Sequence, residues 1–186
     1  NRRRTIECFL SNGELARLGR AFEKLQSKFP VQVTALQVLA LTGCRRSEIL
    51  HLTWSEVRGH RLLLTDSKTG PRTVWVGDEV RDLLAALPRR SKQESVFQLD
   101  NDIDIIRSVS RVWQKAQDLA NLRHVRLHDL RHSFASHAAA MSETLPMIGK
   151  LLGHASVQST ARYAHLDDGL MMVSVERMGQ IISEIL

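Results

Sequence analysis

The sequence predicts a mainly α-helical domain that carries one small antiparallel β-sheet, an α+β fold. Apolar residues recur at helical spacing along most of the chain, and the pattern changes to strand-like alternation once, between residues 61 and 76. No internal repeat or low-complexity tract interrupts it. With 186 residues, 43% of them apolar, the chain is long enough to bury one substantial core.

The first helices are predicted from their end signals. Ser11 and Glu14 have the spacing of a capping box, and apolar residues follow at helical intervals. After Pro30, residues 31–42 are apolar enough for a buried helix, which Gly43 should end. A short helix over residues 45–52 is expected next.

The sheet and the remaining helices follow in order. Two strands, 61–65 and 73–76, flank the polar turn 66–71, which predicts a hairpin. Helical spacing then returns six times, over residues 78–87, 102–119, 128–140, 145–152, 157–164 and 168–185.

Charge and cysteine content narrow the class of protein. The net charge of +6 favours a polyanionic partner such as nucleic acid, although it is also typical of a solvated basic face. Cys8 and Cys44 lack metal-binding spacing, and so low a cysteine content favours a reducing, cytoplasmic compartment, with a single bridge between the two as the alternative. We expect a soluble protein, because no apolar run has membrane-spanning length.

Arg45 and Glu48 lie three residues apart, so on a helix they share a face and the carboxylate can hold the guanidinium. The same spacing is typical of an ordinary surface ion pair. Arg46 should point about 100° away, either to solvent or toward a DNA backbone.

His128 and Arg131 should project side by side from the start of one helix. A helix N-terminus disfavours the protonated form of His128, which leaves a neutral imidazole able to accept a proton. A capping histidine beside a solvated arginine is the plainer alternative. Zinc binding by His128 and His132 lacks a third ligand at suitable spacing.

His154 and Tyr163 can meet only if the helix between them breaks, because nine residues along one helix place them on opposite faces. Gly153 is a natural helix end, and Ser156 is a natural N-cap for a new helix that carries Tyr163. A lone tyrosine is otherwise typical of a half-buried aromatic. Lys68, in the hairpin turn, indicates either simple solubility or a proton donor on a mobile loop.

Together these residues resemble the catalytic domain of the tyrosine recombinases, the phage integrase family, over essentially the whole chain. The family's Arg, Lys, His, Arg, His, Tyr set is filled in order. A Gly-rich connection usual in the family is replaced here by residues 140–143. The matching segments are 42–48, Lys68, 127–132 and 151–154 with Tyr163.

The resemblance implies a DNA breaking-and-rejoining fold and a metal-free phosphoryl transfer without a cofactor. Tyr163 would attack a DNA phosphodiester and form a 3′-phosphotyrosyl link. Arg45 and Arg131 would clamp the non-bridging oxygens, with Glu48 orienting the region around Arg45.

The remaining roles are also implied by the resemblance. Lys68 would protonate the leaving 5′-oxygen, His128 would exchange a proton with Tyr163, and His154 would hydrogen-bond the phosphate. Two alternatives remain. One is a type IB topoisomerase, which uses a similar active site, and the other is a DNA-binding protein that has lost its catalytic activity.

The family also implies an assembly. Residues 1–10 would be a linker from a preceding DNA-binding domain, with Arg2, Arg3 and Arg4 lying on double-stranded DNA, and residues 11–186 the catalytic domain. The family works as a tetramer on DNA, and association should be weak without it. The apolar stripe of residues 168–186 would dock on the next protomer, or else fold back on its own domain.

Overall fold

The computed structural model describes residues 9–67, 70–89, 94–99, 104–141 and 143–154, together with 156, 158–161, 163, 175, 180, 182 and 183. Within them it confirms a mainly helical fold with one small antiparallel sheet. The chain forms two compact units, Asn1–Phe134 and Ala135–Leu186. Lys68 and the arm containing Arg2, Arg3 and Arg4 lie outside the described residues. So does most of the segment 168–185, although its four described residues are helical.

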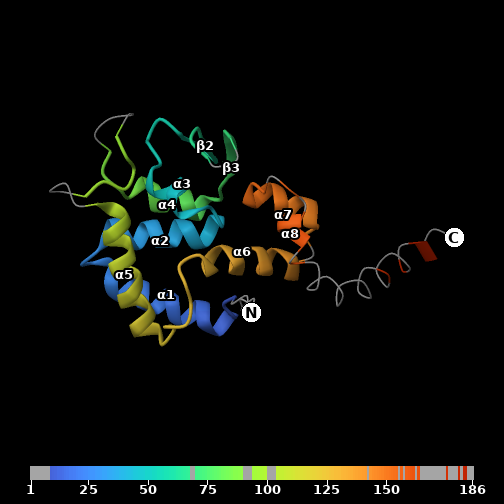
Figure 1. Cartoon of the computed structure of the whole chain (residues 1–186), viewed down its shortest axis with the longest axis horizontal. Helices are drawn as coiled ribbons and strands as arrows, with labels where there is room; N and C mark the ends of the chain where they lie inside the picture. The colour runs from blue at the N-terminus through green and yellow to red at the C-terminus, as the bar shows by residue number, and fades with distance from the viewer. Residues whose placement is uncertain are drawn as a thin grey trace, which may run out of the picture. The chain divides into compact units, whose positions relative to one another are not determined.

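Helix α2 (Pro30–Thr42) is the centre of the first unit. Most of its apolar side chains, among them Val33, Leu36 and Val38, are buried, whereas Leu41 near its end is exposed. Proline occupies the first turn, and Gly43 ends the helix in the left-handed conformation with φ 60°. The helices that pack against it are α1 (Asn12–Gln26), α3 (Arg46–Leu50), α4 (Asp78–Ala85) and α5 (Ile105–Ala120) (Figure 1).

Helix α1 begins with the predicted capping box. The Ser11 backbone N–H donates to the Glu14 carboxylate at 2.9 Å, and the Glu14 N–H donates back to the Ser11 hydroxyl. Leu18 and Phe22 face the core, where α1 runs beside α5 (Figure 1). None of the helices in the described part of the chain is long and apolar enough to cross a membrane.

The sheet has three antiparallel strands in the order β1–β2–β3. The sequence predicted β2 (Arg61–Leu64) and β3 (Arg72–Trp75) but missed the two-residue β1 (Val57–Arg58). In the β2–β3 register Leu62 pairs with Val74, and Leu64 pairs with Arg72. Because paired residues share a face, Arg72 stands on the side that buries the three apolar side chains.

The start of α6 (Asp129–Ala140) is anchored in the first unit. The fully buried Asp129 carboxylate accepts the backbone N–H of Arg126 at 2.7 Å and its Nη2 at 2.8 Å. The Ser133 hydroxyl donates to the Asp129 carbonyl and accepts the N–H of Leu10, both at 2.8 Å. These bonds fix the helix turn that carries the predicted histidine–arginine pair.

The second unit contains α7 (Leu145–Leu152) packed against the short α8 (Gln158–Ala161). Gly153 ends α7 with φ 67°, so the predicted helix break is confirmed. Of the expected helix 157–164, the structure describes the helical stretch Gln158–Ala161. Tyr163 follows it in a turn, because its N–H donates to the Thr160 carbonyl three residues back at 3.0 Å.

Candidate active site

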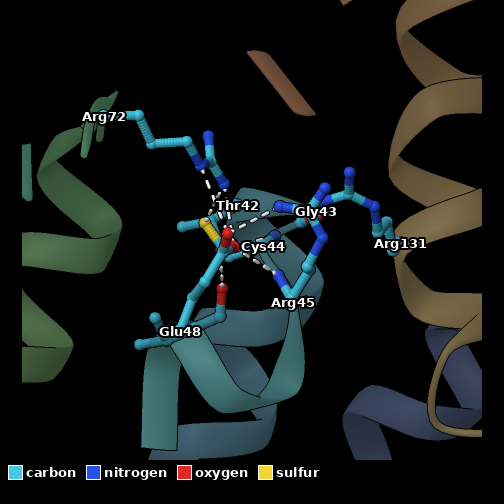
Figure 2. Close-up of polar contacts among 8 residues, drawn as sticks. Thr42, Gly43, Cys44, Arg45, Glu48, Arg72 and Arg131 are labelled. Carbon is cyan, nitrogen blue, oxygen red and sulfur yellow. Dashed lines mark hydrogen bonds and ion pairs between the residues drawn. The ribbon is translucent and has the colours of Figure 1, made fainter. Parts of the chain in front are cut away.

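The buried carboxylate of Glu48, with its side chain 1% exposed, holds two arginines (Figure 2). It accepts the backbone N–H and the Nη1 of Arg45, each at 2.8 Å, so the predicted contact between the two is present. Arg45 precedes α3 as its N-cap residue, with Glu48 at the third helical position. The contact therefore fixes both the backbone and the side chain of Arg45.

Arg72 is the second arginine on Glu48, and the sequence analysis missed it. Its Nη2 donates to one carboxylate oxygen at 2.9 Å and its Nε to the other at 3.4 Å. Its Nη2 also lies 3.5 Å from the Cys44 sulfur. The signal available in the sequence was an arginine at an inward-facing strand position, two residues before the buried Val74.

Arg131 reaches the same loop from α6 (Figure 2). It is 5% exposed, and its Nη1 donates to the Gly43 carbonyl at 2.7 Å. Gly43 has the left-handed conformation that favours glycine, so the residue that ends α2 also supplies the acceptor for Arg131.

The charges of these groups influence one another. Burial alone would raise the pKa of Glu48, but hydrogen bonds from Arg72 and Arg45 outweigh it and lower the pKa to about 2. Burial, followed by repulsion from Arg45, lowers the pKa of Arg131 to about 10. Glu48 and Arg131 are therefore both charged at neutral pH. The two guanidinium groups on Glu48, together with that of Arg131 on the Gly43 carbonyl, form a positively charged site that favours an anion such as a phosphate.

His128 and Arg131 line one pocket of roughly 400 Å³, which confirms that they project to the same side. His128 is exposed, and its ring meets the buried His132 edge-on with 5.0 Å between centroids. Arg46 is exposed, as predicted, and borders the same pocket. Among the described residues no group of three potential ligands is placed to hold a metal ion, so His128 and His132 gain no third ligand there.

In the second unit, His154 directly follows Gly153, and its Nδ1 lies 2.8 Å from the Thr160 hydroxyl oxygen. Tyr163 is buried, with an exposed fraction of 3%. Thr160 is a second residue that the sequence analysis missed. Thr160 and His154 are separated by a turn between two helices. Helical spacing therefore does not predict that they meet.

The family model described as the phage integrase family matches residues 9–169 of the chain. The prophage integrase IntF of Escherichia coli K12 is 31% identical over 132 residues, which cover 67% of this chain and 28% of IntF. The tyrosine recombinase XerC of Pseudomonas aeruginosa is 34% identical over 143 residues, covering 71% of this chain and 46% of XerC. The chain thus spans less than half the length of either relative.

Among solved structures, the catalytic domain of bacteriophage HP1 integrase is similar, with a TM-score of 0.68 and 26% sequence identity. The match covers 91% of this chain and 94% of that domain. The likeness therefore extends over nearly the full length of both chains.

We expect part of the acid sensitivity of the fold to come from Glu48. Its pKa falls from an ordinary 4.5 to about 2 on folding. Its contribution to the free energy of unfolding is therefore complete above about pH 4.5 and is lost as the pH falls toward 2. Urea denaturation across this range should show a shallower pH dependence in Glu48→Gln than in the unmodified chain. Glu23→Gln, at an exposed position of α1, is the control. Equal pH dependence in all three proteins would contradict the assignment.

Proposed function

The chain belongs to the phage integrase family, and we propose that it acts as the catalytic domain of a site-specific DNA recombinase or integrase. The observation that carries this proposal is the arginine cluster, which consists of Arg45, Arg72 and Arg131. Arg45 and Arg131 are held in place before any ligand binds, by Glu48 and by the Gly43 carbonyl respectively. A phosphodiester gains negative charge on its non-bridging oxygens as it reacts, and preorganised guanidinium groups stabilise that charge.

In the proposed reaction the Tyr163 hydroxyl oxygen attacks phosphorus, and the bond from phosphorus to the 5′-oxygen breaks. The products are a 3′-phosphotyrosyl link and a 5′-hydroxyl end. His128 accepts the phenolic proton, Lys68 supplies a proton to the 5′-oxygen, and His154 donates a hydrogen bond to the phosphate. Attack by a 5′-hydroxyl on the phosphotyrosyl link reverses these steps and rejoins the DNA without an external energy source.

The proposed partner is double-stranded DNA. The net charge of +6 supports it, as does the exposed Arg46 beside the pocket that His128 and Arg131 line. We propose that Arg46 contacts the DNA backbone. We also propose that residues 1–10 form an interdomain linker whose Arg2, Arg3 and Arg4 lie on the DNA. Assembly on DNA would then be a tetramer, with residues 168–186 docking on the neighbouring protomer.

Tyr163→Phe should abolish the covalent adduct with a nicked target site, because the substitution removes the nucleophilic oxygen. DNA binding should change by no more than about a factor of three, since one hydroxyl contributes little to phosphate affinity. Denaturing gels and mobility shifts measure the two quantities. An adduct that persists in Tyr163→Phe would rule out this nucleophile. No adduct in the unmodified chain would favour a catalytically silent DNA-binding protein.

Neighbouring arginines provide a matched pair. Arg45→Ala should slow adduct formation by at least about a hundredfold, because it removes a preorganised donor to the transition state. Arg46→Ala should mainly weaken DNA binding in a salt-dependent way, because a contact to a DNA phosphate contributes to affinity by releasing counterions. Single-turnover cleavage at saturating DNA separates the two effects. Equal cleavage defects in both variants would contradict the assignment.

Deleting residues 168–186 should leave binding to a single site intact and prevent strand exchange, because the segment is proposed to join protomers. Analytical ultracentrifugation on DNA and a strand-exchange assay measure these outcomes. A large fall in melting temperature of the shortened chain would show that the segment belongs to its own domain instead.

A further inference from the structure

The backbone of His154 is fixed by the turn that ends α7. Gly153 takes the left-handed conformation, with φ 67° and ψ 49°. The N–H of Gly153 donates to the Lys150 carbonyl at 3.1 Å, and the N–H of His154 donates to the Gly149 carbonyl at 3.0 Å. These two bonds form the usual glycine-terminated helix end. The orientation of the imidazole then depends on what its side chain contacts.

Thr160 contacts both of the proposed catalytic residues of the second unit. Its hydroxyl oxygen lies 2.8 Å from Nδ1 of His154, and its carbonyl accepts the N–H of Tyr163 at 3.0 Å. Thr160 is 2% exposed, so water does not compete strongly for its hydroxyl.

Gly149 makes the approach of Thr160 possible. A Cβ atom at position 149 would lie 3.0 Å from the Thr160 hydroxyl oxygen, closer than side-chain atoms normally pack. Glycine weakens a helix interior, so its presence inside α7 calls for a reason. Here the missing side chain leaves room for the threonine hydroxyl beside the helix.

We propose that Thr160 is a positioning residue for His154. Its hydroxyl donates to Nδ1 and keeps the neutral imidazole in the tautomer that carries its proton on Nε2. Nε2 is then the nitrogen that donates to the phosphate, so this inference rests on the role proposed for His154. If the imidazole becomes protonated, the hydroxyl rotates and accepts a hydrogen bond from Nδ1, because a hydroxyl is both donor and acceptor.

The first test needs no DNA. Nitrogen-15 NMR of the histidine-labelled chain should show His154 with its proton on Nε2 in the unmodified protein and in Thr160→Ser, which keeps the hydroxyl. Thr160→Val should shift the His154 resonances toward a mixture of tautomers. Gly149→Ala should shift them in the same direction because it displaces the hydroxyl. Gly19→Ala is its control, since a Cβ there would meet no atom within 4 Å. Unchanged His154 resonances in Thr160→Val would overturn the proposal.

The second test is adduct formation on a nicked site. Thr160→Val should slow it by about tenfold, and Thr160→Ser should stay within about threefold of the unmodified chain, as expected for one hydrogen bond to a catalytic group. If Thr160→Val lowers the melting temperature, Thr160→Ala compared with Thr160→Ser gives the same answer, since both lack the methyl group. Equal rates with and without the hydroxyl would overturn the proposal. Absence of any adduct in the unmodified chain would count against the proposed function, while the NMR result would still decide the role of Thr160.

Discussion

The buried carboxylate of Glu48 is the interaction on which the arginine cluster depends. It accepts two hydrogen bonds from Arg45 and two from Arg72, so it joins the start of α3 to strand β3. A buried carboxylate is costly unless its oxygens are satisfied, and here four donors offset that cost. The loop that Glu48 holds also presents the Gly43 carbonyl to Arg131. Three elements far apart in the sequence therefore meet at one short loop.

Much of the fold was predictable because its signals are local. The capping box of Ser11 and Glu14 involves neighbours three residues apart, and the ends of α2 and α7 require only a glycine in a left-handed conformation. The pairing of Arg45 with Glu48 also follows from spacing along one segment. In each case the deciding interaction lies within about one helical turn, so spacing along the sequence is enough to predict which residues meet.

The rest depends on contacts between segments, which spacing does not encode. Arg72 lies 24 residues from Glu48, and Arg131 lies 88 residues from Gly43. Thr160 meets His154 only because two helices pack across a turn. Strand β1 is two residues long, too short to show alternation. The sequence thus supplied candidate site residues and the pairing of Arg45 with Glu48, but not the contacts between segments that hold Arg131 and His154.

The arginine cluster is better arranged for receiving an anion than for stabilising the isolated domain. The positive charges of Arg45 and Arg72 disfavour the charge on Arg131, which is already penalised by burial. A phosphate bearing negative charge would offset this repulsion, since each guanidinium would attract it.

Little rearrangement would be needed, because Glu48 and the Gly43 carbonyl already hold the groups. In the second unit, Gly149 and Thr160 support His154 in a similar way. The repulsion among the arginines of the first unit is opposed by the buried core around α2, which stabilises the fold without using these side chains.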